Sequence, residues 1–402
     1  MTKTKFTDVL KKYAMSIVLV LVIILFYVLT DKAILFPQNI NNLLSQNAYV
    51  FVLAVGMLLC ILTGGNIDLA VGSVVCFVGA IGGVALDKDM NFIVAFIIML
   101  VIGLLVGMWQ GFWIAFVDIP PFIATLAGMY AFRGLSNVVL NGQALNLSDL
   151  PSFLNVFGGG ADCYIPDFFG NGSLNMTCML AGIVGVVIYL FMTIKGRIDT
   201  KKRGYATPAL LGEVLKMVII SAVVLFVTYK LASYKGIPTS LIWVLLVVLV
   251  FGYVTQKTTI GRDLYAVGGN KKAAQLSGVN VKKVYFFSYS FMGLLAGLAG
   301  VLTIARAASA QPTYGQGYEM DAIGACFIGG ASAYGGIGTV PGVIIGAVLM
   351  GVINQGMSIC GVDSNIQKVV KGLVLLGAVI FDVVSKKERK RTKKSKKAVA
   401  GK

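Results

Sequence analysis

The chain has 402 residues, of which 57% are hydrophobic and only 13% are charged, and its mean hydropathy is +0.85. In soluble domains about a quarter of all residues are charged, so this composition excludes a protein that faces water on all sides. The net charge is +17, but its concentration in a few clusters favours a membrane topology signal over a nucleic-acid-binding surface.

Apolar runs that could each cross a bilayer recur along the whole sequence. A transmembrane helix needs roughly 17–25 apolar residues, and its backbone must satisfy its hydrogen bonds within the helix. The sequence therefore predicts an all-α fold, a polytopic transmembrane helical bundle of about 10–12 segments that forms one domain over residues 1–402. Glycine interrupts the stretches 48–86 and 321–357, which are expected to be half-helices or re-entrant pieces. The expected segments are 15–30, 48–63, 67–86, 92–117, 121–140, 176–194, 215–231, 240–255, 285–305, 321–335, 340–357 and 366–384.

Basic residues are concentrated in four clusters, at 3–12, 195–203, 257–283 and 386–397. Positive charge is retained on the cytoplasmic side of membranes, and an even number of segments separates each cluster from the next. The sequence thus predicts a multi-pass protein of the plasma (inner) membrane with both termini in the cytoplasm. The parts outside the bilayer are expected to be an extracytoplasmic loop at 141–175, a cytoplasmic linker at 195–213, a cytoplasmic loop at 256–284 and a basic cytoplasmic tail at 385–402.

Glycine spacing predicts where helices approach each other closely. Gly103, Gly107 and Gly111 fall on one helical face, and small residues at this spacing let backbones meet in lipid. Such a face is either a moving interface or static packing, and static packing is preferred for any single pair. The same spacing recurs at Gly79 with Gly83, Gly293 with Gly297, and Gly342 with Gly346.

Two glycine-rich segments, 63–73 and 329–339, each lie where one apolar run breaks and the next begins. Paired broken helices are typical of transporters, but the match is too weak to establish an internal repeat. Asp68, in the first segment, either lines a path across the membrane or caps the following helix, whose N-terminus favours an acid. The cap is the preferred interpretation. Arg133 and Arg306 are expected near a membrane interface, where their side chains can reach water.

Residues that most enzymes need are missing. The chain has no histidine and no phosphate-binding GKS or GKT motif, so a histidine-based catalytic site and an ATP-binding loop of its own are excluded. Its 17 acidic residues are spread thinly, which disfavours an integral-membrane transferase. The six cysteines form no CxxC pair, and no metal site is expected. Cys163 and Cys178 flank a segment placed outside, where free thiols are preferred although a disulfide is conceivable.

Uncharged polar residues within the apolar runs are candidates for a sugar path, because hydroxyl groups are bound by amides and indoles without strong charge. Each could equally form a hydrogen bond between helices. The candidates are Gln46, Asn47, Asn66, Asp68, Gln110, Trp113, Asn137, Asn354 and Gln355.

The most informative segment is cytoplasmic, at 261–283. Asn270 is expected to cap a short helix that starts near Lys271. Small residues then follow at spacings that give one face able to press into a groove on a partner, surrounded by basic residues. The alternative is a solvated amphipathic linker. The small residues are Ala273, Ala274, Ser277 and Gly278.

This segment resembles the coupling-loop signature of permeases in bacterial ribose-, xylose- and galactose-type ABC importers. The stretch 64–73 resembles the N-terminal signature of these permeases, with Ala70 where serine is usual, and 123–134, 234–238 and 320–330 are similar to the xylose-permease or multiple-monosaccharide branch. The resemblance covers nearly the whole chain. It implies a vitamin-B12-permease-like (type II) fold and an ATPase-coupling loop containing Gly261, Arg262, Tyr265, Gly268, Gly269, Asn270, Ala273, Ala274, Ser277 and Gly278.

The resemblance also implies partners. Two copies of the chain would form the pore, a cytoplasmic ATP-binding subunit would bind ATP and Mg²⁺, and an extracytoplasmic sugar-binding protein would dock outside. The chain itself would hold no cofactor, and lipid would be its other neighbour. The loop around Cys163 and the long basic tail depart from the family pattern, so the sugar stays open among xylose, galactose, arabinose and glucose. Two alternatives remain, a permease for another small polar solute and a self-sufficient secondary sugar transporter.

Overall fold

The computed structural model describes residues 3–160, 162–170, 172, 174–205 and 210–400, with side chains described between residues 16 and 384 of these ranges. Nearly all of the regular structure is helical. The elements are α1 (Lys3–Leu29), the short 3-10 helix η1 (Ala33–Leu35), α2 (Pro37–Gln46), α3 (Ala48–Leu62), α4 (Val71–Asp87), α5 (Phe92–Ala115), α6 (Pro121–Val139), β1 (Leu145–Asn146), α7 (Pro151–Phe157), α8 (Met176–Lys202), α9 (Leu210–Ala232), α10 (Thr239–Lys257), α11 (Thr259–Gly269), α12 (Lys271–Leu276), α13 (Val281–Ala307), β2 (Ser309–Ala310), α14 (Tyr318–Ile328), α15 (Val340–Ile359) and α16 (Ser364–Ala400).

The predicted all-α, polytopic fold is confirmed. Within the described ranges, seven helices are long and apolar enough to cross a membrane, namely α5, α6, α8, α9, α10, α13 and α15. Helices α2 and α3 pass the same test together as one span bent by 43°, while α4 and the Ser16–Leu29 part of α1 are shorter apolar helices. The second interrupted stretch is broken as expected, because α14 ends at Ile328 and α15 begins only at Val340.

Two boundaries differ from the expected ones. Helix α8 continues to Lys202 and α9 begins at Leu210, so both ends of the region expected to be a linker, 195–213, are helical. Helix α16 continues from the last apolar segment through the basic tail to Ala400. Lysine and arginine are good helix formers, so charge that stops a membrane span does not stop the helix.

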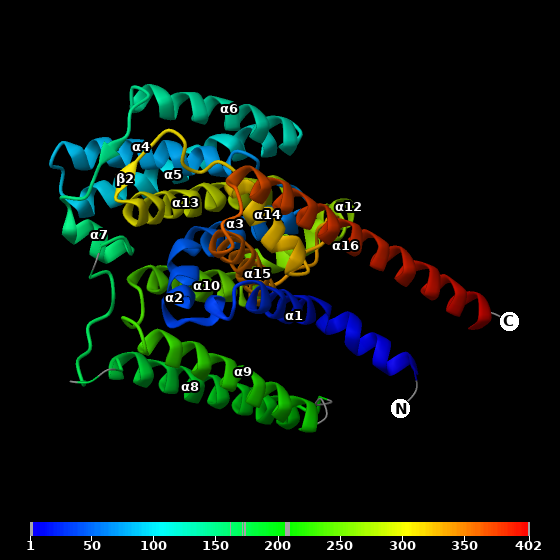
Figure 1. Ribbon diagram of the computed structural model, residues 1–402. Coiled ribbons are helices and arrows are strands. Elements are labelled where there is room, and N and C mark those ends of the chain that lie inside the picture. The colour runs from blue at the N-terminus through cyan, green and yellow to red at the C-terminus, as the bar shows by residue number, and fades with distance from the viewer. Residues whose placement is uncertain (1–2, 161, 171, 173, 206–209, 401–402) are drawn as a thin grey trace.

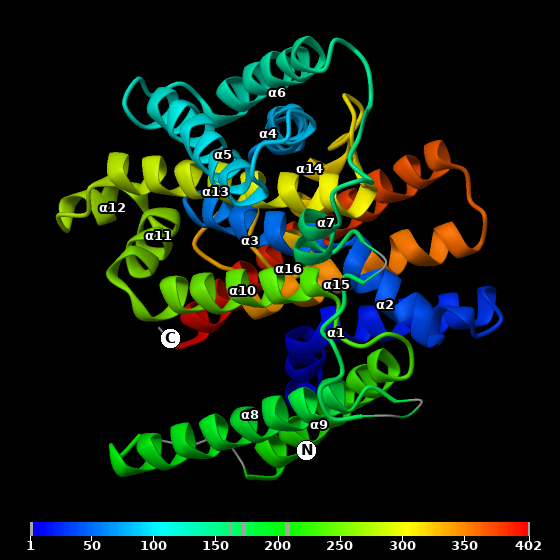
Figure 2. The same cartoon turned by 90° about the vertical axis from the view of Figure 1, so that its left-hand side faces the viewer.

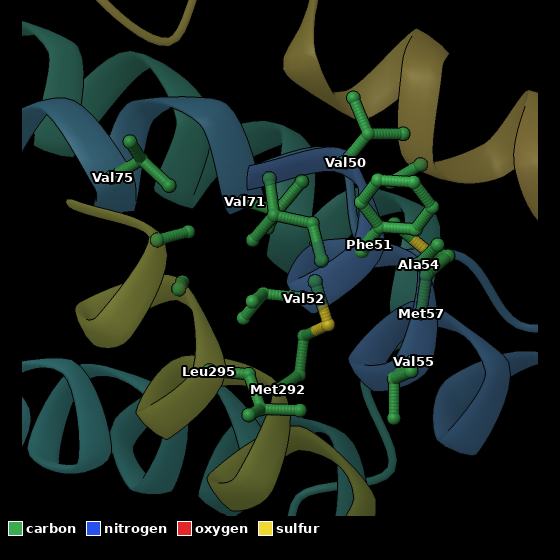
Figure 3. Packing of buried hydrophobic residues seen from close by; sticks show 14 of the residues in the cluster. Val50, Phe51, Val52, Ala54, Val55, Met57, Val71, Val75, Met292 and Leu295 are labelled. Atoms are coloured by element: carbon green, nitrogen blue, oxygen red, sulfur yellow. The ribbon is translucent and has the colours of Figure 1, made fainter. Parts of the chain in front are cut away.

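Helix α3 forms the centre of the protein. Every residue from 50 to 62 is buried, which fits a helix that is apolar all round rather than on one stripe. Figure 3 shows Met292 and Leu295 reaching from α13 toward the labelled side chains of α3. Met292 lies directly over Gly56, where no larger side chain would fit.

Helices α5 and α13 approach each other through glycine, as predicted. A Cβ atom at Gly103 would fall 2.5 Å from the carbonyl oxygen of Gly293, and one at Gly107 would fall 2.9 Å from the Cα of Gly293. The other predicted pairs are also sites of close approach. Gly79 and Gly83 face Ile304 and Ala310, and Gly342 and Gly346 face the backbone of Gly329 and Ala325.

Helices α8 and α9 form a hairpin at the periphery, set apart from the other helices in both views (Figures 1 and 2). An ion pair between Arg197 and Glu213 joins its two helices. A small hydrophobic cluster of Ile40, Cys178 and Leu231 attaches the hairpin to α2. The two termini lie at one end of the molecule in Figure 1, toward the end that carries α12 and away from α7 and β2. This arrangement agrees with a cytoplasmic side that holds both termini and the 256–284 loop.

The loop at 141–175 is folded onto the ends of α10 and α13. Strand β1 pairs antiparallel with β2, directly after α13. Thr239 Oγ1 donates to the carbonyl of Asn155 at 2.6 Å, and Trp243 Nε1 donates to that of Val156 at 3.1 Å. Cys163 and Cys178 are both buried free thiols.

Candidate functional site

The coupling segment, residues 259–278, consists of two short helices joined at a single residue. Thr258 caps α11 by accepting from the backbone nitrogen of Gly261 at 3.3 Å. Asn270 is extended, with φ −160°, and its Oδ1 accepts from the backbone nitrogen of Ala273 at 3.0 Å. The predicted cap at Asn270 is therefore confirmed. Its extended backbone ends α11, and its side chain starts α12 in a new direction.

One predicted feature of this segment is wrong in part. Ala274 is 5% exposed and lies in the main hydrophobic cluster with Leu264 and Val267, which are also buried. It therefore faces the protein's own interior, not a partner. The reason is helical geometry, because α12 is one turn and a half long and must use one position to attach itself to the bundle.

The outward face of α12 carries a residue that the sequence reasoning missed. Leu276 is 91% exposed, in a helix whose other exposed positions are small or polar. A lone large apolar residue in a small, polar helix was the available signal for it. Ala273, Ser277 and Gly278 are exposed beside it as predicted, and so are Arg262, Gly269, Lys271 and Lys272.

Helix α11 rests on two non-helical segments that are far apart in sequence. We call residues 63–70 and 329–339 the glycine loops. Gly336 donates its backbone N–H to the carbonyl of Leu62 at 3.1 Å, so the second loop meets the end of α3 where the first begins. Tyr265 Oη donates to the carbonyl of Gly338 at 2.7 Å. Burial raises the pKa of Tyr265, so its hydroxyl remains a neutral donor.

Glycine allows this contact to be as close as it is. Gly268 of α11 has backbone of both Leu62 and Gly336 at the place where a Cβ would sit. Gly335, with φ +79°, lies against the backbone of Gly64 in the same way. The structure therefore brings the two glycine-rich segments together directly under the coupling segment. A displacement of α11 would press on the start of α4 and of α15 through backbone, not through flexible side chains.

The preferred interpretation of Asp68 as the cap of α4 is wrong, although Asp68 lies in the turn that leads into this helix. It is 2% exposed, and its Oδ1 accepts from the backbone nitrogen of Ala70 at 2.8 Å. The N-cap residue is Ala70 itself. Asp68 thus closes the turn that leads into the helix rather than capping it directly. Asn66 donates to Thr63 Oγ1 at 3.1 Å within the same loop.

The remaining path candidates do not converge on one site. Asn47 and Asn354 meet, with Asn354 Nδ2 donating to Asn47 Oδ1 at 3.3 Å. Asn137 is exposed and donates to the carbonyl of Arg133 in its own helix. Gln355 is buried in α15. Gln110 and Trp113 are on α5, and within the described chain the Gln110 Nε2 and Trp113 Nε1 atoms are buried without a hydrogen-bond partner. A role for each in transport stays a prediction.

The structure adds a cavity that the sequence did not reveal. It has a volume of about 210 Å³ and lies between the start of α3, the end of α13 and the start of α14. Of the predicted path residues, only Gln46 lines it. Arg306, expected at an interface, lines it as well. Tyrosines dominate the rest of its wall, and we call it the tyrosine cavity; they are Tyr49, Tyr314 and Tyr318.

A buried ion pair lies behind this wall. Lys371 Nζ of α16 is 3.0 Å from Asp321 Oδ1 and 3.1 Å from Oδ2, and the Asp321 side chain is 1% exposed. Tyr49 Oη donates to Asp321 Oδ2 at 2.8 Å. The second arginine expected near an interface, Arg133, donates to the carbonyl of Tyr314 at 2.6 Å. It thereby holds the loop between α13 and α14 in place.

Comparisons with known proteins agree on one group of relatives. The family described as branched-chain amino acid transport system / permease component matches residues 39–379. A xylose transport system permease protein of Haemophilus influenzae is 36% identical over 384 residues, which cover 94% of this chain and 98% of the relative. The same named protein of Escherichia coli K12 is 35% identical over 382 residues, covering 94% and 93%. A ribose import permease protein of that strain is 33% identical over 346 residues, covering 86% and 85%. No solved structure matches the chain.

Proposed function

Because the chain belongs to the family of branched-chain amino acid transport system permease components, we propose that it is the membrane-spanning permease subunit of an ATP-driven ABC importer for a monosaccharide. The observation that carries this proposal is the coupling segment. Two short capped helices present an exposed leucine and basic residues outward, and Tyr265 and Gly268 of the first helix contact the glycine loops. A self-sufficient transporter does not need a segment like this one, whose exposed side is free to bind a separate ATPase subunit.

In this proposal, a cytoplasmic ATP-binding subunit receives Leu276 in a groove and binds ATP and Mg²⁺, while this chain holds no cofactor and does no covalent chemistry. Burial of the exposed Leu276 side chain against the partner would remove apolar surface from water. ATP-driven motion of the partner would move α12 and α11, and α11 would displace the glycine loops. Access to the pore would then alternate between the two membrane faces.

The remaining parts of the proposal rest on the relatives and on the charge placement in the sequence. The chain resides in the plasma membrane with both termini in the cytoplasm, and two copies form the pore. An extracytoplasmic sugar-binding protein docks over β1, α7 and the end of α13. Xylose or a related aldose is the proposed solute, since the relatives that match include two xylose permeases, covered to 98% and 93%, and a ribose permease, covered to 85%. Another small polar solute is the second possibility within the family.

One observation favours a rival of another class, a secondary transporter driven by an ion gradient. Ionisable groups within the membrane are a common feature of proton-coupled transport, and Asp321 and Lys371 are such groups. Asp321 is, however, ion-paired with Lys371, and its Oδ2 accepts hydrogen bonds from both Lys371 and Tyr49, whereas its Oδ1 has no hydrogen-bond partner in the described part of the chain. The protonophore in the reconstitution experiment separates a structural ion pair from one that exchanges protons.

Reconstitution tests the proposal. The permease is placed in proteoliposomes with its ATPase subunit and binding protein, and uptake of labelled xylose, galactose, arabinose, glucose and ribose is measured. We expect uptake that requires ATP and the ATPase subunit and that a protonophore leaves unchanged. Uptake without the ATPase subunit, abolished by the protonophore, would establish the secondary transporter instead.

The role of α12 is tested separately. Leu276→Asp should abolish both co-purification of the ATPase subunit and sugar uptake, because it places a charge in an apolar groove. Leu211→Asp is the matched control, since Leu211 is 81% exposed but lies on α9, away from the coupling segment. Equal co-purification by the two variants would remove α12 from the interface.

A further inference from the structure

The tyrosine cavity is not explained by packing. Ala48 and Tyr49 at the start of α3 line it together with Thr303 and Arg306 near the end of α13, so the two central helices are antiparallel and open a space between their ends. Helix α13 starts directly after the coupling segment. Its other end, and the cavity with it, therefore lies toward the extracytoplasmic side.

The size of the cavity fits a small solute. Its volume of about 210 Å³ leaves room for a small molecule, and the pocket is open on one side.

The wall has the two components that carbohydrate recognition requires. Tyr49 and Tyr318 line the cavity and stack on each other, with ring centroids 3.6 Å apart and planes inclined by 14°, so only the outer face or the edge of either ring is available to the C–H face of a sugar ring. Polar groups are few and placed on other elements, as in most small-molecule sites. They are Gln46, Thr303, Arg306 and Tyr314.

The side chain of Arg306 gives the strongest indication that the cavity binds a ligand. Its Nε atom is buried and has no hydrogen-bond partner in the described part of the chain. A buried donor without a partner is unfavourable, and a guanidinium group can only donate. A ligand with acceptor oxygens, such as sugar hydroxyls, would satisfy it.

The aromatic wall is held rigidly. Tyr49 donates to Asp321, which Lys371 holds from α16. Tyr314 Oη and Ser309 Oγ are 2.6 Å apart, so this side chain is fixed as well. Rigid side chains lose little freedom on binding a ligand. Asp321 and Lys371 are positioning residues in this arrangement.

We propose that the tyrosine cavity is a monosaccharide-binding site of the permease itself, occupied when the sugar has left the binding protein and before it crosses the membrane. This inference rests on the proposed function. Tyr318 and Tyr49 form its aromatic wall, and Arg306 is its principal donor to the sugar hydroxyls.

The test uses the complete importer in proteoliposomes and measures two quantities, sugar taken up and ATP hydrolysed. Arg306→Met and Tyr318→Leu should each lower uptake per ATP about ten-fold, the cost of one lost bidentate or aromatic contact. The ATPase activity stimulated by the loaded binding protein should stay within about two-fold, which shows that the variants are folded and assembled. Tyr318→Phe keeps the ring and should stay near wild type. Tyr253→Leu, at an exposed position of α10, is the matched control and should also stay near wild type.

A second measurement addresses the ligand directly. In nanodiscs without the binding protein, D-xylose should give saturation-transfer NMR signals with the wild-type permease that Arg306→Met abolishes and that L-leucine does not compete away. Wild-type uptake per ATP in both Arg306→Met and Tyr318→Leu would refute the site while leaving the proposed function intact. Competition by leucine would overturn the sugar assignment. Absence of ATP-dependent uptake of any monosaccharide by the wild type would instead refute the proposed function.

Discussion

Lys371→Met offers a direct test of the buried ion pair. The substitution keeps the length and the apolar stem of the side chain but removes the charge that lies 3.0 Å from Asp321 Oδ1. Asp321, 1% exposed, would keep only the hydrogen bond from Tyr49 at 2.8 Å. Breaking a buried pair by removing one partner costs about 3–5 kcal/mol, because the other charge is left without compensation. The retained bond from Tyr49, worth about 1.5–3 kcal/mol to a charged acceptor, keeps the loss from being larger.

We therefore expect Lys371→Met to lower the free energy of unfolding by about 3 kcal/mol, which is roughly a 150-fold change in the unfolding equilibrium. Steric trapping in bicelles or mild-detergent unfolding measures this quantity. The double variant Lys371→Met, Asp321→Asn removes both charges and should recover most of the lost stability. A loss below about 0.5 kcal/mol in the single variant, or a double variant less stable than the single one, would refute the reasoning.

Two further predictions concern groups outside the membrane. Tyr265→Phe removes the hydrogen bond to the Gly338 carbonyl at 2.7 Å. Because such a bond is worth about 1 kcal/mol, its loss should lower sugar uptake per ATP by up to about five-fold while stimulated ATPase activity persists. An equal loss of uptake and of ATPase activity would contradict a coupling role. Asp167 is held by backbone N–H groups, among them that of Met176 at 3.0 Å. Desolvation alone would raise the pKa of Asp167, but these hydrogen bonds outweigh it and lower the pKa. Because the folded pKa lies below the unfolded value, the stabilisation is present above the unfolded pKa and is lost as pH falls through the folded pKa. The melting temperature of the wild type should therefore fall on the acid side, and that of Asp167→Asn should not. Melting temperatures that depend on pH in the same way in both proteins would contradict this prediction.

Much of the local structure could be predicted from residues alone. Three features depend only on side chains within a few positions of one another. They are the positions of the apolar helices, the break within 321–357 and the cap at Asn270. Glycine spacing predicted the contact of α5 with α13, because small residues repeated every four positions expose backbone on one face whatever lies opposite.

Other features depend on which residues meet, and no local pattern encodes that. Ala274 and Leu276 are two positions apart in one short helix, yet the first is buried and the second is exposed. Which side of α12 faces inward is set by its attachment to α13, not by its own sequence. The prediction from small residues therefore placed the buried Ala274 on the outward face and missed the exposed Leu276.

The sequence by itself determined that this chain is a polytopic helical bundle, because hydropathy is a property of the chain read in order, and charge placement and motifs predicted its orientation and its coupling loop. Only the tertiary structure decided that the two glycine loops lie under α11 and that Tyr49, Arg306 and Tyr318 enclose one cavity. Tyr49 and Tyr318 are separated by most of the chain. They meet because α14, which begins at Tyr318, packs against α3, and the face that each helix presents is fixed only when all the helices pack together.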